Sequence, residues 1–319
     1  MPQNELAILE QYRKAESIVE QQPLEALAIS QEALAQATQN DVHPDYTRAL
    51  TSVIVSAKRR KKLETPQSLT ETLTDALREP RRYHAPSFFG QARINEELGL
   101  VLRLQGADRK SVDLYGQAAD ALQLASSQYA DALENLTNEI ETAWNIEGRL
   151  IRANQVTAAT FAEAEPITTN PKDLHRYLAE GVPAANRAIA RRTKRGEGMT
   201  SGLLDAYHTL GVVHTIGASP SPEGRRHFIA ANEAFESAHT IAEKISAPAV
   251  AAIMHLRFAY LHLKFESERA VIVRHFHAFM DNTEIIDPSA ITQLETRITP
   301  VATFLGGVAL AEAKTLYQR

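Results

Sequence analysis

Apolar residues recur every three or four positions along most of the chain, the spacing that places them on one face of an α-helix. The first such stretch covers residues 4–21, where Leu6, Leu9, Tyr12 and Ile18 share a face. It ends just before a proline, a residue that is well tolerated at the first position of a following helix. The hydrophobic pattern therefore predicts an all-α protein.

The helical stretches come in pairs, and prolines and glycines mark most of the breaks between them, which indicates helical hairpins. We expect the following segments, in chain order: 4–21 with 23–37; 44–63 with 66–78; a hairpin within 92–125; one long helix over 129–152, followed by 157–164; 173–178 with 183–195; 207–214 with 231–238; 248–263 with 271–278; and 289–298 with 300–317.

The hairpin at 92–125 carries a recognisable arrangement of small and aromatic residues. In its first helix, Gly99 follows a leucine and is followed three residues later by Leu102. In its second helix, Ser111, Tyr115 and Ala118 are spaced by four and then three residues. A small residue in one helix lets the other approach closely, and an aromatic ring of the second helix can fill the remaining gap.

The same arrangement returns in the second half of the chain. Tyr207 and a Leu-Gly pair ending at Gly211 lie in one predicted helix, and Ala231, Phe235 and Ala238 lie in the next. Both hairpins resemble the tetratricopeptide repeat (TPR). The resemblance implies an all-α fold, a right-handed α-solenoid of roughly six to eight antiparallel helix hairpins. A single hairpin cannot bury its apolar face, so each must stack on its neighbours.

A weaker match to the same repeat lies between these two. Trp144 and Gly148 keep the distance from aromatic residue to glycine, and Thr157, Phe161 and Ala164 keep the spacing of the second helix.

Two irregularities interrupt the array. The segment 165–171 holds two prolines around a Thr-Thr-Asn turn. It predicts N-terminal repeats over 1–165 and C-terminal repeats with capping helices over 172–319, with one continuous array as the alternative. Residues 217–224 add about eight residues to the family spacing. We expect a surface loop there, or alternatively a tip that contacts a partner.

Composition narrows the class of protein. At 319 residues and 44% hydrophobic, the chain can bury a large core. A net charge of −5 gives no global electrostatic case for binding nucleic acid or acidic membranes. There is no cysteine, no recognisable signal peptide and no apolar run long enough for a membrane helix. We expect a cytoplasmic protein that does not associate with membranes.

No constellation predicts catalysis. The sequence has no glycine-rich phosphate loop, no Gly-x-Ser-x-Gly motif and no cysteine nucleophile, so we expect a protein that is not an enzyme and needs no cofactor. Four of the histidines, His255, His262, His275 and His277, gather in one region. No metal-binding motif accompanies them, and we expect packing roles for them and no metal site.

The TPR resemblance implies a binding function. In that family, the first helices of successive hairpins line a concave groove that receives a peptide or a partner helix. We therefore expect a protein–protein interaction scaffold or peptide-binding receptor. Its arginines and lysines would suit a carboxylate or acidic peptide. The candidate partner-binding residues are Arg93, Glu97, Leu100, Arg103, His208, Val212, Arg257, Tyr260 and Lys264.

Two further hypotheses stay open. Basic segments at 58–62, 78–82 and 191–195 are the basis for an alternative function, binding of RNA or DNA. Cations in the last turn of a helix also complement the helix dipole, so these segments have a purely structural explanation too. The last predicted helix is apolar enough to suggest a homodimer.

Overall fold

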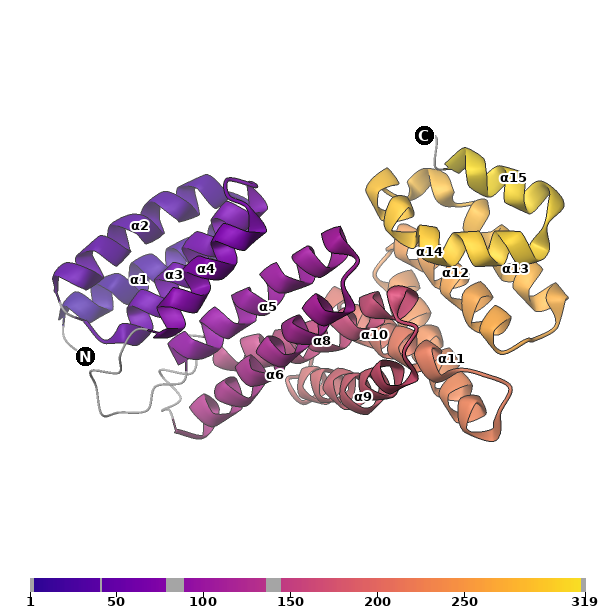
Figure 1. Cartoon of the computed structure of the whole chain (residues 1–319), viewed down its shortest axis with the longest axis horizontal. Helices are drawn as coiled ribbons and strands as arrows, with labels where there is room; N and C mark the ends of the chain where they lie inside the picture. Colours follow the sequence, from indigo (N-terminus) through magenta and orange to yellow (C-terminus); the bar gives the residue numbers. More distant parts are fainter. Residues whose placement is uncertain (1–2, 41, 79–88, 136–144, 317–319) are drawn as a thin grey trace. The chain divides into compact units, whose positions relative to one another are not determined.

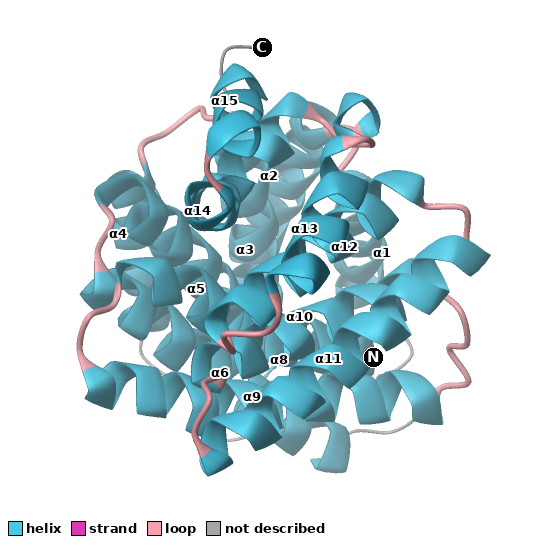
Figure 2. Cartoon of the chain, turned by 90° about the vertical axis from the view of Figure 1, so that its right-hand side faces the viewer, coloured by secondary structure: helices cyan, strands magenta, loops and turns pink. Residues whose placement is uncertain are grey.

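The computed structural model describes residues 3–40, 42–78, 89–135 and 145–316, and the statements below concern these residues. They form α-helices joined by short loops, with no β-strand among them (Figures 1 and 2). The helices are α1 Gln3–Ile18, α2 Pro23–Gln39, α3 Pro44–Arg60, α4 Pro66–Arg78, α5 Phe89–Arg109, α6 Val112–Asn135, α8 Ile146–Ala164, α9 Pro171–Lys194, α10 Ser201–Gly217, α11 Pro222–Lys244, α12 Pro248–Lys264, α13 Arg269–Met280, α14 Pro288–Leu305 and α15 Gly307–Leu316. The prediction of an all-α chain of helical hairpins is confirmed.

The chain divides into two compact units, Met1–Thr160 and Phe161–Arg319. The division falls inside α8, a few residues before the proline-rich break that the sequence marks. Within that break, Glu165–Ile167 forms a 3₁₀ turn, η1, and α9 begins at Pro171.

Unit 1 is a succession of hairpins in which each helix packs on the one that follows it. α1 packs on α2, α2 on α3, and α5 on α6, while α3 also contacts α5 directly. One buried core joins them, with Ile8, Ala33, Leu50, Phe89 and Tyr129 contributed by five different helices. The ring of Phe89 lies 6.1 Å from that of Tyr129, so aromatic contacts reinforce the α5–α6 hairpin.

Unit 2 repeats this plan. α9 packs on α10, α10 on α11, α11 on α12, and α12 on α13. The last residues of α8 join it through Phe161, whose ring stacks on Tyr177 of α9 at 5.1 Å. The side chains of Leu256, Phe276, Ile298 and others form a second core that runs from α12 to α15.

The two glycines of the repeat motif lie where helices approach most closely. A Cβ atom added to Gly99 would lie 2.5 Å from Cγ of Leu122 on α6. One added to Gly211 would lie 2.5 Å from two ring atoms of Phe235 on α11. Both distances are shorter than a side chain tolerates, so these hairpins require glycine. The packing role that the motif predicts for the glycines is confirmed.

Local signals begin several helices where the sequence places them. A proline occupies an early helical position in α2, α3, α11, α12 and α14. The Thr200 hydroxyl accepts a hydrogen bond from the amide of Leu203, and the Ser221 hydroxyl accepts one from Gly224, so side chains cap α10 and α11. The boundaries of these hairpins therefore follow from local chemistry.

The expected single helix over 129–152 is wrong. α6 ends at Asn135, Asn145 adopts φ of 49°, and α8 begins at Ile146. Asparagine tolerates this left-handed conformation better than most residues, which allows the chain to turn there. Trp144 lies outside the described residues. The weak repeat match is also wrong as a hairpin, because Gly148 and Phe161 both lie on α8.

Two prolines that we expected to begin new helices lie inside helices. α9 continues through Pro183 to Lys194, and α14 continues through Pro300. An interior proline costs a helix roughly 3 kcal/mol, but Ala184 and Ala185 are fully covered by neighbouring helices, and this packing favours continuity. The break between α14 and α15 instead lies at Gly306, where φ is 68°, a conformation that would strain a residue with a side chain.

The insertion at 217–224 is mostly not a loop. α10 runs to Gly217 and α11 begins at Pro222, so only residues 218–221 separate the two helices. The additional length is therefore taken up by longer helices, and the expected surface loop is reduced to a tight connection.

The apolar C-terminal segment packs within its own unit. Val301, Leu305, Ala309 and Ala313 belong to the core that α12 begins, and α15 packs back on α14. A homodimer through this segment stays a prediction.

Replacing Gly211 by alanine should destabilise the chain, because the new methyl group meets the buried ring of Phe235. Alanine favours a helix by about 1 kcal/mol over glycine, whereas overpacking a core costs about 1–3 kcal/mol. We expect a net loss in the free energy of unfolding, measured by urea denaturation. Gly198→Ala is the control, since nothing lies within 4 Å of its added Cβ. A Gly211→Ala variant as stable as the parent chain would contradict this account.

Candidate functional site

The first helices of successive hairpins contact one another within each unit. α1 packs on α3 and α3 on α5 in unit 1, and α10 packs on α12 and α12 on α14 in unit 2. Together with the close contacts at Gly99 and Gly211, this is the arrangement that the repeat motif predicts. The hairpins are TPR-like. Charged side chains gather on these first helices in both units.

In unit 1 the charges centre on Glu96 of α5, which is almost fully buried. Its carboxylate accepts hydrogen bonds from Arg93 at 2.8 Å and from the Tyr129 hydroxyl at 2.7 Å. Arg149 and Arg152 of α8 lie 3.4 Å from its other oxygen. One carboxylate therefore connects side chains of α5, α6 and α8.

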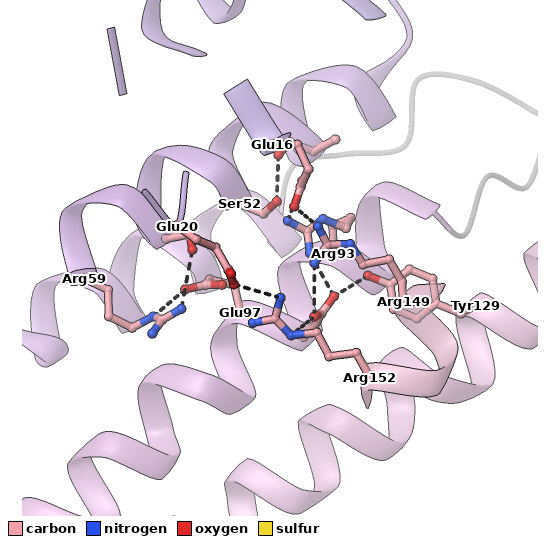
Figure 3. Close-up of polar contacts among 12 residues, drawn as sticks. Glu16, Glu20, Ser52, Arg59, Arg93, Glu97, Tyr129, Arg149 and Arg152 are labelled. Carbon is pink, nitrogen blue, oxygen red and sulfur yellow. Dashed lines mark hydrogen bonds and ion pairs between the residues drawn. The ribbon is translucent and has the colours of Figure 1, made fainter. Parts of the chain in front are cut away.

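Further pairs extend this group to α1 and α3 (Figure 3). Glu16 of α1 pairs with Arg93 at 3.0 Å and also with Arg149. Glu97 accepts from Arg59 of α3 at 2.6 Å. We call the set the arginine–glutamate cluster, and its members are Glu16, Glu20, Arg59, Arg60, Arg93, Glu96, Glu97, Arg149 and Arg152.

The electrostatics of this cluster are those of an internal network. Burial lowers the pKa of Arg149 to about 10, and the nearby Arg152 cation adds to the effect. Burial opposes the charged form of Arg93 as well, but Tyr12 and Glu96 outweigh it and raise its pKa. Burial and the Glu96 charge raise the pKa of Tyr129, which therefore donates its proton as a neutral phenol. Arg93 and Arg149 therefore stay charged at neutral pH, and the carboxylates of Glu16 and Glu96 compensate them.

Two of the predicted partner-binding residues belong to this cluster. Arg93 and Glu97 are each only 2% exposed. Leu100 and Arg103, further along α5, are half-buried. The structure thus places Arg93 and Glu97 in the interior of unit 1 instead of on an open surface, because opposite charges on three helices converge there. A role of these four residues in binding stays a prediction.

Unit 2 holds a second group, which differs in its balance of charge. Glu165 of η1 accepts from Lys264 of α12 at 3.1 Å and from Arg297 of α14 at 2.9 Å. The guanidinium of Arg297 lies over the ring of Tyr260, 4.9 Å from its centre. Arg257 donates from Nε to Nε2 of His208 on α10 at 3.1 Å. We call these residues the cationic cluster: Glu165, His208, Arg257, Tyr260, Lys264 and Arg297.

This cluster holds three cations and the carboxylate of Glu165, which pairs with two of them. The charge of Glu163 also acts on Arg257. None of the ion pairs among the described residues involves Arg257, whose hydrogen-bond partner is a histidine. Burial lowers the pKa of His208 to about 3, assisted by the Arg257 charge, so the imidazole is neutral and accepts the hydrogen bond. Burial, together with the Arg297 charge, lowers the pKa of Arg257 to about 9. At neutral pH the cluster is therefore a partly buried site with surplus positive charge.

The sequence identified most of this cluster. Four predicted residues, His208, Arg257, Tyr260 and Lys264, come together on α10 and α12. Val212, one turn after His208, is buried. Sequence reasoning missed Glu165, which lies in the segment interpreted as a break, and Arg297, which lies in the predicted helix 289–298. The available signal was an arginine next to Ile298, which lies on the same helical face as Leu294.

The basic segments of the nucleic-acid hypothesis are partly neutralised. Lys58 pairs with Glu64 at 2.6 Å, and Arg59 and Arg60 pair with glutamates of the arginine–glutamate cluster. Arg192 pairs with Glu197 at 2.7 Å. Arg81 and Arg82 lie outside the described residues. These ion pairs leave less charge available for phosphates than the sequence suggests.

No group of three or more histidine, aspartate or glutamate side chains in the described part of the chain is arranged to hold a metal ion. In that same part, no helix is both long and apolar enough to span a bilayer.

Comparison with known proteins yields only distant structural likeness. No family model and no curated protein matches the sequence. The chain is similar to two crystal structures of nearly identical TPR-like repeats from Podosopora anserina, described as those of a kinesin light chain. One of them, a variant with a single substitution, has a TM-score of 0.47 and 14% identity over 77% of this chain and 99% of its own. The other has a TM-score of 0.46 and 14% identity over 75% and 96%. This likeness assigns no ligand or activity.

Replacing Glu96 by glutamine should strongly destabilise unit 1. The substitution keeps the shape of the side chain but removes the charge that compensates Arg93 and Arg149, and breaking a buried ion pair costs about 3–5 kcal/mol. We expect a loss of this size in the free energy of unfolding, measured by urea denaturation.

The matched control is Asp75→Asn. Its pair with Arg78 is exposed, since both side chains are 75% accessible, and such pairs contribute about 0–1 kcal/mol. Equal effects of the two substitutions would show that the arginine–glutamate cluster does not hold its helices together.

Proposed function

We propose that this chain is a protein-interaction module whose cationic cluster binds an acidic peptide segment of a partner. The observation that carries the proposal is the imbalance of charge: Lys264 and Arg297 share the carboxylate of Glu165, while Arg257 donates its hydrogen bond to the neutral His208. A carboxylate from a partner would compensate the surplus.

The side chains suit a carboxylate ligand. Guanidinium groups bind carboxylates through two parallel hydrogen bonds, and bonds between charged groups are stronger than neutral ones. His208 accepts the hydrogen bond that Nε of Arg257 donates, and this contact fixes the orientation of the guanidinium plane. The half-buried positions of Arg257, Tyr260 and Lys264 reduce solvent screening while leaving part of each side chain accessible.

Glu165 has a defined place in this proposal. Glu165 forms ion pairs with Lys264 and Arg297 in the unbound chain, so a partner carboxylate would compete with it for these two cations. Arg257 forms no ion pair in the described structure and is therefore the anchor that a ligand engages first. Removing the Glu165 charge should accordingly tighten binding.

The repeat architecture supports an interaction function and gives no support for catalysis. Stacked hairpins present side chains from several first helices together, an arrangement that repeat proteins use to bind extended partners. Binding of nucleic acid, the alternative, has less support because several cations of the basic segments already pair with carboxylates.

Replacing Arg257 by glutamine should weaken binding of an acidic peptide by about 10–100-fold, because a hydrogen bond to a charged group contributes about 1.5–3 kcal/mol. Glu165→Gln should strengthen it. The measurement is fluorescence anisotropy of a labelled peptide rich in Asp and Glu, with its Asn and Gln counterpart as the uncharged probe.

Lys244→Gln is the matched control, since Lys244 is an exposed cation of the same unit outside the cluster. Circular dichroism verifies that each variant is folded. Equal affinity of the parent chain for both peptides would refute the proposal. Tighter binding of single-stranded RNA or DNA, lost steeply with added salt, would favour the alternative instead.

A further inference from the structure

A continuous ladder of aromatic and imidazole rings connects α11, α12 and α13. It starts at Phe265, just after α12, whose ring stacks on Phe228 of α11 at 4.1 Å. Phe228 contacts His262 of α12 at 5.2 Å, and His262 stacks on His275 of α13 at 5.8 Å. His275 contacts His255 of α12 at 5.5 Å, and His255 contacts His239 of α11 at 5.1 Å. We call these six residues the ring ladder.

The histidines of the ladder interact as uncharged groups. Nδ1 of His255 lies 3.2 Å from Nδ1 of His275, a hydrogen bond that requires one ring to donate and the other to accept. Two protonated imidazoles cannot form it, because both nitrogens would carry hydrogen. His262 bonds through Nδ1 to the Ser267 hydroxyl at 2.9 Å. The bond between His255 and His275 therefore persists only while at least one of the two rings is neutral.

The charged neighbours of the ladder mostly oppose protonation. Arg274 of α13 lies beside His275, with its guanidinium 3.5 Å from Nε2. Glu243 of α11 lies 3.8 Å from His239 and is the one carboxylate that favours a charged ring. On the flanking helices, His214 of α10 pairs with His227 of α11, and Arg297 of α14 lies over Tyr260.

We propose that the ring ladder is a proton-sensitive latch that holds α13 against α12 at neutral pH and releases it on acidification. The geometry gives the reason: four imidazoles from three helices lie ring against ring, so each added proton places a positive charge next to another imidazole. This inference does not depend on the proposed ligand, because the ladder and the cationic cluster share no residue.

The direction of the pH dependence follows from the pKa values of the ladder. Burial, with the nearby His255 and Arg274, lowers the pKa of His275 to about 4, and burial also lowers the pKa of His255 and His262. The open state therefore binds more protons than the closed state, so stability rises with pH. The contribution is complete above the ordinary histidine value of about 6.5 and is lost as the pH falls toward 4.

The test is hydrogen exchange of the whole chain at pH 7.5 and 5.0, read as protection factors, which correct for the pH dependence of intrinsic exchange. With pKa values of about 4 closed and about 6.5 open, protonation of His275 alone should lower the protection of α13 roughly 30-fold at pH 5.0. Protection in α5 and α6, which carry no histidine, should change far less.

The His275→Phe variant keeps a ring in the stack, and this ring cannot be protonated. The fall in the protection of α13 between pH 7.5 and 5.0 should therefore be at least tenfold smaller in this variant than in the parent chain. His277→Phe is the matched control, because His277 is exposed on the same helix; it should behave as the parent chain does. The latch is refuted if α13 of the parent chain loses no more protection than α5 and α6, a result that needs no variant. It is equally refuted if His275→Phe shows the full acid response.

Discussion

The close approach of paired helices at small residues is the constraint on which the rest of this protein depends. At Gly99 and Gly211 a side chain of the second helix, Leu122 or Phe235, fills the space that a Cβ atom on the first helix would take. This closeness leaves each hairpin with an apolar face that only the next hairpin can cover. Successive first helices are thereby brought into contact, and their charged residues become neighbours although dozens of positions separate them in the sequence.

The two units use this juxtaposition differently. In unit 1, arginines and glutamates from α1, α3, α5 and α8 pair with one another around the buried carboxylate of Glu96, so the arginine–glutamate cluster resembles a polar core. Such a cluster favours one arrangement of helices, since leaving any member unpaired is costly. In unit 2, cations exceed carboxylates, and a neutral histidine takes the place of a counter-charge at Arg257. The first arrangement is held by its own ion pairs, whereas the second is the one for which we propose a ligand.

Histidine has two different roles in unit 2, and both depend on burial. His208 stays neutral far below physiological pH and serves as a hydrogen-bond acceptor that orients an arginine. Burial lowers the pKa of His255, His262 and His275 in the ring ladder, and the ordinary pKa of histidine is close enough to physiological pH for acidification to matter. The same residue type thus provides a fixed acceptor in one place and a titratable contact in another.

The sequence by itself determined the helices, most of the hairpins and the glycines that pair them, because 3.6-residue periodicity, prolines and helix caps act locally. It also indicated His208, Arg257, Tyr260 and Lys264, since helical periodicity puts them on one side of α10 and α12. Only the tertiary structure decided that α9 and α14 continue through Pro183 and Pro300, because packing outweighs the local cost of proline. It alone decided that Arg93 and Glu97 are buried and that Glu165 and Arg297 join the cationic cluster. Those outcomes depend on which distant helix supplies the opposite charge, and no local pattern contains that information.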